Sequence, residues 1–401
     1  MTSQLGSIAA PLRPRTRRRS GIVLAVVLVL IFVLVIAITA FQRRAIIDTT
    51  IASNRLRAAE ADTLARGGQR LAAAMVYVIH LKEKADSAGI ATDDAPPIQN
   101  SLSTAGSTPI DEIWTRMGDY EVDLGNDRSL RITIEDEGAK LNLNALVPQE
   151  VPSDTPDDDA SSAAATTNDT TSADDEEAEN YLTEVLDYIV DGIETSAGEK
   201  TYDTRGIARN LLDYMDADGD SKTGRAEDTY YREQDPPYSP RNGPFLTVGE
   251  IGLVEGVDPT LLKAMRDYVT VHPIGSTAGI NLNRAKPWVL SIVYSGIGGD
   301  REFIDEQTVR DIWTLREKSK ILCDNTAYDP TRCVAIGEVG NRSLAEGSIY
   351  PETPLPAEVS VFRVVAEAKV GNLTRRIEAI YDTRSFTGPQ VLSWRRLRGP
   401  G

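Results

Sequence analysis

The sequence predicts an α+β fold in which a large helical domain interrupts a smaller unit built from a long N-terminal helix and β-strands. An apolar run near the N-terminus, at residues 22–41, continues into an amphipathic helical pattern. Strand patterns occur before residue 147 and again near the C-terminus, and a block of helical patterns lies between them. Because strands of one sheet can come from distant parts of a chain, this order indicates one α+β unit with an insertion.

Composition limits the classes of function. The 401 residues carry a net charge of −17, although the first 21 residues hold five arginines and no acid. The acidic remainder repels nucleic acid and favours cations, so we expect no nucleic-acid partner. Two histidines and two cysteines are too few for most zinc sites or histidine relays. A helix-hairpin-helix-like turn at Gly256 is therefore interpreted as a packing scaffold.

Residues 22–41 predict a transmembrane helix. The run contains no charged residue, and twenty helical residues span roughly 30 Å, the thickness of the hydrocarbon core of a bilayer. The arginines before it predict a cytoplasmic N-terminus. A cleaved signal peptide is excluded because the run is too long and is followed by Gln42, Arg43 and Arg44 rather than a small-residue site.

The junction between the basic leader (residues 1–21) and the apolar run has a second interpretation. Ser20 and Gly21 directly precede Ile22, an arrangement that resembles prepilins, in which a dedicated peptidase cuts after a glycine on the cytoplasmic side. This resemblance implies processing between Gly21 and Ile22, with an uncleaved anchor as the alternative. Most pilins have a glutamate five residues after the cut, where this chain has Val26.

The first part of the α+β unit is assigned to residues 42–147. Apolar residues at helical spacing extend the membrane helix to about Lys84, and strand patterns follow at 118–124 and 130–135. The stripe is predicted to pack on a sheet and to contact partner subunits. The predicted partner-binding residues are Leu64, Leu71, Met75 and Val78.

The remaining segments are assigned from composition and pattern. Residues 148–180 are predicted to be a disordered acidic linker, since ten acids and no base occur between Asp154 and Glu179. Residues 181–332 carry helical periodicity and helix-start signals, including Asp258 before Pro259. Residues 333–401 return to the sheet, with a hairpin signal at Gly371-Asn372.

A cluster of carboxylates after the second helical pattern of the insertion suggests a calcium site. Acidic residues at alternate positions, with a carboxylate at the twelfth, supply the hard oxygen ligands that calcium prefers. Ser221 replaces the usual glycine at the sixth position, so this is not a regular EF-hand. The alternative is a solvated acidic turn, which repulsion among the carboxylates disfavours unless a cation is present. The candidate ligands are Asp216, Asp218, Asp220, Glu227 and Asp228.

Cys323 and Cys333 are the only cysteines, and they are ten positions apart. In an oxidising compartment a disulfide is expected, and closing such a short loop contributes roughly 3 kcal/mol. Two reduced, buried thiols are the alternative.

Several segments, in order along the chain, resemble general secretion pathway protein K, the K-type minor pseudopilins of type II secretion. They are Lys140–Asn144, Asn210–Asp218, Gly224–Tyr231, Pro237-Tyr238, Asn242–Pro244, Leu246–Ile251, Tyr268–Thr270 and Ile280–Asn283. K-type members also have an apolar residue at the position of Val26. The resemblance implies a pilin-like fold with a large inserted helical domain that binds calcium near the acidic motif.

The same resemblance implies a role. It predicts a non-catalytic, single-pass inner-membrane protein with a periplasmic body, processed by prepilin peptidase. It would assemble with I-, J- and H-type minor pseudopilins into a complex that caps and initiates the periplasmic pseudopilus. The large insertion also favours the filament tip, because a subunit stacked above it would clash. Two alternatives stay open: a minor pilin of a type IV pilus, and a membrane-tethered, calcium-dependent periplasmic hydrolase.

Overall fold

The fold was obtained as a computed structural model of the chain. It describes residues 20–87, 114, 117–147, 170–193, 201–217, 221, 226–296, 301–324, 331–339, 344, 347–357, 359–385 and 388–397. Most of the predicted leader, and residues 148–169 of the predicted linker, therefore lie outside the described residues.

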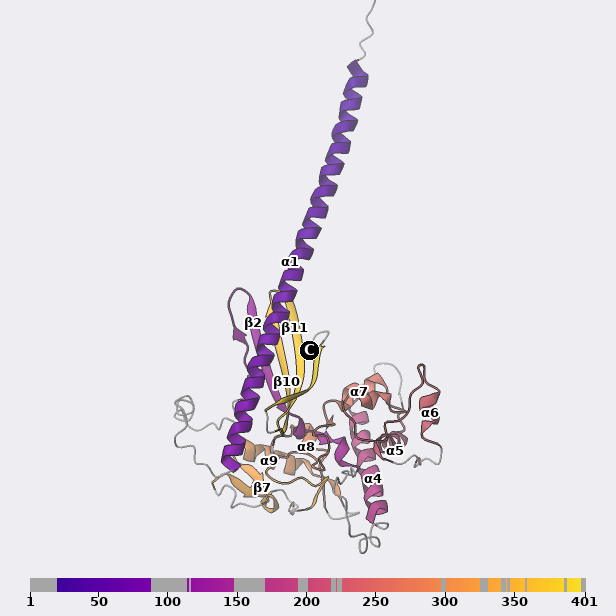
Figure 1. The fold of residues 1–401 in the computed structure, drawn as a ribbon, viewed down its shortest axis with the longest axis vertical. Helices are drawn as coiled ribbons and strands as arrows, with labels where there is room; N and C mark the ends of the chain where they lie inside the picture. Colours follow the sequence, from indigo (N-terminus) through magenta and orange to yellow (C-terminus); the bar gives the residue numbers. More distant parts are fainter. Residues whose placement is uncertain are drawn as a thin grey trace, which may run out of the picture.

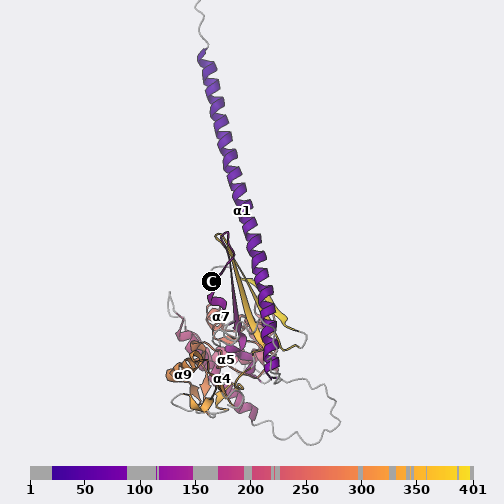
Figure 2. The same cartoon turned by 90° about the vertical axis from the view of Figure 1, so that its left-hand side faces the viewer.

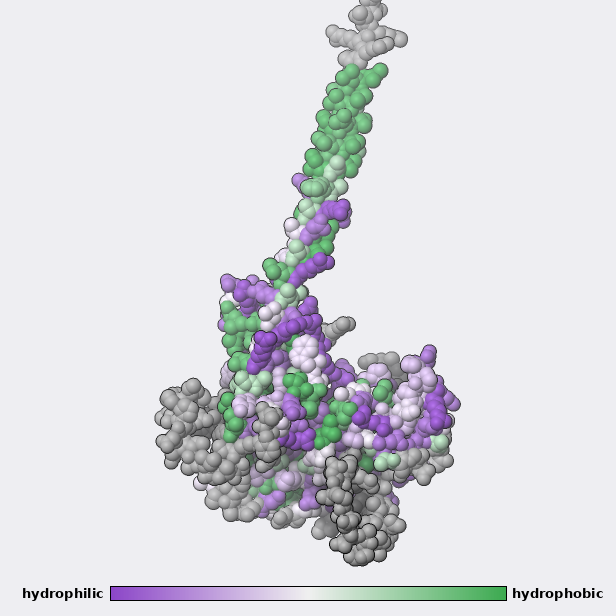
Figure 3. Space-filling view, in the orientation of Figure 1, coloured by the Kyte–Doolittle hydropathy of each residue, from purple (hydrophilic) through white to green (hydrophobic). Residues whose placement is uncertain are grey.

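A single helix, α1 (Ser20–Ser87), runs the length of the molecule. Its N-terminal half stands clear of every other element, and its C-terminal half lies along a sheet (Figures 1 and 2). Figure 3 shows that the free half is apolar on the visible face at its N-terminal end and becomes mixed in polarity toward the sheet. The chain thus separates an apolar rod from a folded body.

Five antiparallel strands form the sheet, in the order β1-β2-β10-β11-β12. Their bounds are Val122–Asp123, Arg128–Asp136, Val361–Val370, Leu373–Asp382 and Gln390–Leu397. The central strand β10 pairs with β2 and β11, which come from opposite ends of the sequence. We call α1 with this sheet the pilin-like unit.

Small residues let α1 lie close to the sheet. Its buried face is made mainly of Ala61, Ala65, Gly68, Ala72 and Val76. A β-carbon on Gly68 would come within 2.9 Å of Leu130 Cδ1, so this position requires glycine's missing side chain. Farther along, Trp114 meets Phe362 edge to face at 5.4 Å and closes the distal end of this core.

The buried Gln69 fixes the position of α1 on the sheet. Its Nε2 donates to the backbone carbonyls of Val364 (3.1 Å) and Ile377 (2.7 Å), which lie in adjacent strands. Tyr381 donates from its hydroxyl to Gln69 Oε1 at 3.2 Å. A buried amide satisfied in this way specifies one register of helix against sheet.

Residues 137–357, which we call the inserted unit, lie at the end of α1 that is distant from the apolar half (Figure 1). The described α-helices of the unit are α4 (Thr170–Asp191), α5 (Thr204–Met215), α6 (Asp228–Arg232), α7 (Pro259–Met265), α8 (Pro287–Leu290) and α9 (Glu306–Glu317). The fold class predicted from the sequence, a pilin-like α+β unit with a large helical insertion, is confirmed.

The inserted unit also contains short strands that the sequence did not predict. β3 (Leu141–Asn142) pairs with β4 (Val269–Thr270), and β5 (Tyr294–Ser295) pairs with β6 (Glu302–Phe303) and β9 (Ile349–Tyr350). β7 (Ile321–Cys323) pairs with β8 (Cys333–Ala335) in parallel. Most of these strands have two residues, too few for an alternating pattern to be visible in the sequence.

The boundaries of the insertion differ from the predicted 181–332. Leu141, Leu143 and Leu146, assigned from the sequence to the first pilin-like segment (42–147), lie in the core of the inserted unit. So do Ile336 and Leu355, which the sequence assigned to the segment 333–401. The physical reason is that β3 joins β4 and β9 joins β5, so both connecting segments fold onto the insertion.

The predicted linker (148–180) also ends earlier than expected, because α4 begins at Thr170. The first turn of α4 contains no acid, but acidic residues farther along the helix have partners from elsewhere in the unit. Glu177 pairs with Arg301 at 2.6 Å, and Glu179 with Arg205 at 2.8 Å. An acidic composition that predicts disorder in isolation is thus compatible with a helix whose acids are paired.

Candidate metal centre and helix surface

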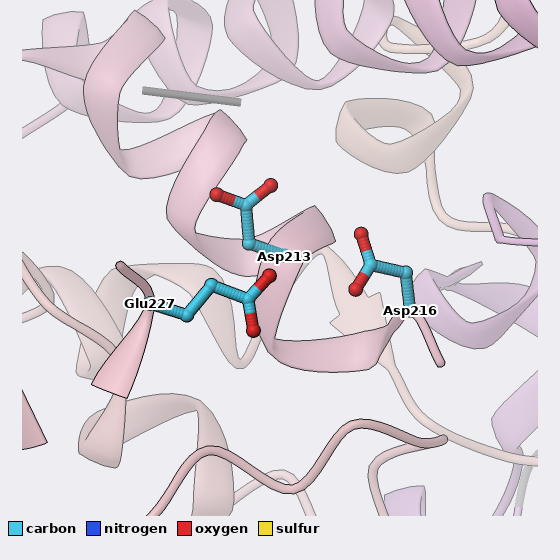
Figure 4. Close-up of side chains that lie close together, drawn as sticks. All are labelled: Asp213, Asp216 and Glu227. Carbon is cyan, nitrogen blue, oxygen red and sulfur yellow. The ribbon is translucent and has the colours of Figure 1, made fainter. Parts of the chain in front are cut away.

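Three carboxylates meet where α5 ends and α6 begins. Asp213 lies in the last turn of α5, Asp216 caps that helix, and Glu227 directly precedes α6. One oxygen atom from each lies within 4.8 Å of the others (Figure 4). Asp213 is buried and accepts a hydrogen bond from Ser221 Oγ at 2.9 Å.

Aromatic packing holds the two sides of this centre together. Tyr214 stacks on Phe245 with ring centroids 5.2 Å apart, and it meets Tyr231 of α6 edge to face at 5.8 Å. The backbone carbonyl of Tyr214 accepts from Asn242 N at 3.1 Å. Because Tyr214 and Tyr231 adjoin the acidic residues, their packing fixes α5 and α6 at the separation that brings Asp216 and Glu227 together.

Asp213 and Glu227, but not Asp216, border a cavity of about 10 Å³. The lining residues are Asn210, Asp213, Tyr214, Ser221, Ala226, Glu227, Tyr231, Pro240 and Glu255. This volume suits one particle of the size of a water molecule. Carboxylate and hydroxyl oxygens are hard metal ligands, which calcium prefers and which softer metals do not favour. The described residues therefore fit a calcium ion, which on binding would supply positive charge that draws the carboxylates together.

The structure brings together only part of the predicted ligand set. Asp216 and Glu227 come together as expected, whereas Asp218 and Asp220 lie outside the described residues. Asp228 is not a member of the cluster and forms an ion pair with Arg232, one turn along α6. Asp213 was missed. Its spacing of three residues from Asp216 places both on one face at the end of a helix, a signal that could have found it.

α1 carries the features of a membrane anchor. Its N-terminal segment is long and apolar enough to cross a bilayer, and none of that segment is buried in the protein. The predicted processing residues Gly21 and Ile22 lie in the first turn of the helix. Cleavage between them stays a prediction.

The predicted partner-binding residues of α1 do not share one environment. Leu64 and Met75 are half-buried and pack against the pilin-like core. Leu71 and Val78 are 53% and 51% exposed. The stripe inferred from the sequence thus lies beside the face that contacts the sheet, because alanine and glycine, rather than leucine, form the buried face.

An apolar stripe on α1 continues along the side that the sheet leaves uncovered. Leu64, Gly67, Leu71, Ala74, Val78 and Leu81 alternate at spacings of three and four residues. All except Leu64 are exposed, and a β-carbon at Gly67 would meet no atom within 4 Å. We call these six residues the apolar seam. Such spacing is typical of a helix that packs along a second helix.

Cys323 and Cys333 form a disulfide, as the sequence predicted, with their Cα atoms 5.6 Å apart. The bond links β7 to β8 inside the inserted unit. The bond therefore closes a loop between two neighbouring strands that run parallel to each other.

Comparisons with known proteins agree on one family. Residues 139–274 match the family model described as type II secretion system (T2SS), protein K. Type II secretion system protein K of Pseudomonas aeruginosa is 24% identical over 359 residues, which cover 89% of this chain and 86% of that protein. A putative type II secretion system protein K of Escherichia coli K12 is 31% identical over 88 residues, which cover 22% of this chain and only 27% of that relative.

A solved structure is also similar. The chain resembles one in the GspK-GspI-GspJ complex of the type 2 secretion system from enterotoxigenic E. coli, with a TM-score of 0.42 and 16% identity over 83% of this chain and 99% of that one. The matched domain, residues 139–274, spans the carboxylate cluster and all of α4 to α7. Residues 139–274 thus match the protein K domain of the type II secretion system, and the chain over most of its length is similar to a type II secretion system protein K.

Proposed function

We propose that this protein is a minor pseudopilin that caps the periplasmic pseudopilus and helps to initiate it. The observation that carries the proposal is the place of the inserted unit, at the end of α1 farthest from the membrane segment (Figure 1). Pseudopilins assemble by repeated contacts between long helices, so a bulky unit at the distal end leaves no room for a subunit above. Such a chain fits the terminal position and not the interior of a filament.

The apolar seam supports lateral contact with other membrane-anchored helices. Its spacing favours a helix that runs beside α1, and the small side chains at Gly67 and Ala74 permit close approach of the two backbones. The exposed Arg70 borders the seam, which favours a partner with acidic side chains there. We propose that I- and J-type minor pseudopilins, which accompany protein K in the similar complex, occupy this surface. An H-type subunit would join the same complex.

Substitution of the seam tests this assignment. The double variant Leu71→Arg/Val78→Arg should lose co-purification with full-length I- and J-type subunits, because both positions are exposed and apolar. Ala59→Arg provides the matched control, since Ala59 is exposed on α1 but lies outside the seam. If the unmodified chain, the double variant and Ala59→Arg recover the partner subunits equally, the seam is not part of the interface. Leu64 is avoided because it also packs against the chain's own sheet.

We also propose the membrane orientation and the processing. The five arginines before Ile22 favour a cytoplasmic leader, which leaves the acidic body in the periplasm. Prepilin peptidase would then cut after Gly21. Mass spectrometry of the mature protein should give an N-terminus at Ile22 with active peptidase, and a longer chain without it. An N-terminus at Met1 in both cases would contradict this processing.

We further propose that the carboxylate centre binds calcium and that the role of the protein is structural rather than catalytic. The oxygen-rich donor set supports calcium, with Asp213, Asp216 and Glu227 as ligands. A cavity of about 10 Å³ is too small for an organic substrate beside the ion. Both cysteines are bonded to each other, so neither is available as a thiol nucleophile.

A further inference from the structure

A second cavity lies in the inserted unit and shares no lining residue with the cavity of the carboxylate centre. Its volume is about 380 Å³, within the range of pockets that bind ligands. Residues of the segments 276–278 and 347–354 line it, together with Asp324, which follows β7, and Ile336, which follows β8. Figure 1 shows β7 at the end of the molecule that is distant from the apolar half of α1. We call this cavity the distal cavity.

A glycine holds two of the lining segments side by side. Gly279 donates from its backbone N–H to the carbonyl of Glu352 at 3.3 Å and to Thr353 Oγ1 at 3.0 Å. A β-carbon on Gly279 would lie 2.6 Å from the backbone oxygen of Pro351, so a side chain there would force the segments apart. The hydroxyl of Thr353, which is 6% exposed, donates in turn to Pro351 O at 3.2 Å. This part of the wall is thus fixed by close backbone contacts.

Asp324 is fixed in a similar way. Its backbone N–H donates to Leu355 O at 2.9 Å, and its carboxylate Oδ2 accepts from the Leu355 N–H at 2.7 Å. The preceding residue, Cys323, is bonded to Cys333, which ties β7 to β8 and limits the movement of Asp324. Hydrogen bonds and a disulfide therefore hold the lining residues in place, as a binding site requires.

The lining combines apolar side chains with acidic ones. Ile336 and Ile349 are buried and give the cavity an apolar part. Asp324 and Glu352 contribute carboxylates, and none of the described lining residues is basic. Within the described part of the chain, no ion pair or hydrogen bond engages the exposed carboxylate of Glu352. Hydroxyl groups are added by Ser276, Thr277 and Thr353.

This combination selects the chemistry of the ligand. The two carboxylates would repel an anion, and an uncharged apolar group would leave them without a partner. A bare metal ion prefers oxygen ligands on all sides and would gain nothing from the isoleucine side chains. A flexible alkyl chain that ends in a cation matches both parts of the lining. Lysine and arginine have side chains of this kind.

We propose that the distal cavity binds a lysine or arginine side chain of another protein. The aliphatic stem lies against Ile336 and Ile349, and the cationic group meets Asp324 and Glu352. The excess of acidic residues in the inserted unit attracts a basic surface toward the cavity over longer distances. The inference goes beyond the proposed place of the protein in the filament, because the cavity is formed within one chain.

Binding of capped amino acids tests the proposal in the full-length chain, in lipid nanodiscs and with the disulfide intact. Nuclear magnetic resonance of isoleucine methyl groups would follow titrations with N-acetyl-lysine methylamide and N-acetyl-arginine methylamide. At least one compound should shift the signals of Ile336 and Ile349 in a saturable manner, and the signal of Ile207, which does not line the cavity, should stay unchanged. The norleucine analogue has the stem of lysine without its charge and should bind roughly tenfold more weakly than lysine.

Two results of these titrations would overturn the proposal. One is equal binding of the lysine and norleucine compounds, because the carboxylates would then contribute nothing. The other is the absence of shifts at Ile336 and Ile349 with both cationic compounds.

Conservative variants identify the acidic groups. Glu352→Gln and Asp324→Asn each remove one charge, and Asp324→Asn keeps an oxygen that can accept from the Leu355 N–H. Each should weaken binding by about fivefold, the upper value for a partly exposed ion pair. Glu233→Gln is the matched control, since Glu233 is an exposed acid of the same unit outside the lining. Unchanged affinity in both cavity variants would contradict the proposal. If neither variant folds, the comparison of lysine with norleucine on the unmodified chain decides.

Discussion

The pilin-like unit buries small side chains between one long helix and one sheet, whereas the inserted unit buries large side chains among many short elements. Ala65, Gly68 and Ala72 form the helix side of the first core, while Tyr181 stands at the centre of the second, in contact with the rings of Tyr294, Phe303 and Tyr350. Long helices and strands are held together by many backbone hydrogen bonds within one regular element. Short elements depend more on side-chain contacts and cross-links for their stability.

Charge separates the same two regions. The inserted unit (137–357) holds 41 acidic and 19 basic residues, while segments 22–84, 117–136 and 358–401 hold 14 acidic and 18 basic ones. Excess like charge destabilises a compact state through self-repulsion. The inserted unit accordingly has a disulfide and a candidate cation centre, features that the described part of the pilin-like unit does not show. We infer that the first unit depends on packing and the second also on bound ions.

The largest expected effect comes from breaking the packed core of the pilin-like unit. Phe362→Ala should lower the free energy of unfolding by about 3–5 kcal/mol, because it removes a fully buried ring that meets Trp114. Urea unfolding would measure the loss. If the two units are stabilised separately, the calcium response of the inserted unit should remain, and loss of that response would show that the cores are coupled.

Calcium removal should act on the other unit. At a hundredfold excess over its dissociation constant, a bound ion stabilises the folded state by about 2.7 kcal/mol. The inserted unit should therefore melt higher with calcium than with chelator, and Asp216→Ala/Glu227→Ala should lose most of that difference. Asp228→Ala is the matched control, because Asp228 pairs with Arg232 outside the cluster. Equal melting with calcium and with chelator would leave an ordinary acidic turn.

Two adjacent glycines give a smaller and more discriminating test of the helix–sheet contact. Gly68→Ala should destabilise the pilin-like unit by about 1–3 kcal/mol, because its β-carbon would approach Leu130 Cδ1 and Ala366 Cβ at 2.9 and 3.2 Å. Gly67→Ala meets open space and should stabilise the helix by about 0.5–1 kcal/mol. Thermal unfolding of both variants measures the difference, and equal effects would contradict the close packing of α1 on the sheet.

The sequence predicted the parts of the fold that have a strong period. Alternation in residues 130–135 and the hairpin signal at Gly371 correspond to β2 and to the β10–β11 pair. Strand β12 was missed because its residues are largely exposed and arginine-rich, so no alternation marks them. It pairs only at the edge of the sheet, where the register of β11 determines its position.

The site was predicted in part for similar reasons. The spacing between Asp216 and Glu227 is visible in the sequence. Asp213 lies on α5, and its carboxylate joins the cluster through the tertiary packing of the neighbouring Tyr214. The stripe predicted from the sequence lies beside the buried face of α1, because leucines were expected at the buried contact, which alanine and glycine in fact form. Where two backbones approach closely, the contact residues are small. Small residues leave a weaker signal in the sequence than large apolar side chains do.

The position of this chain in assembled filaments tests the central claim most directly. Pseudopili assembled with the other subunits would be labelled through an epitope inserted after Asn372, in the exposed β10–β11 turn, and examined by electron microscopy. A capping subunit predicts label at one end of each filament and none along its length. Label at regular intervals along the filament would contradict the proposed role, because the inserted unit could then be accommodated between stacked subunits.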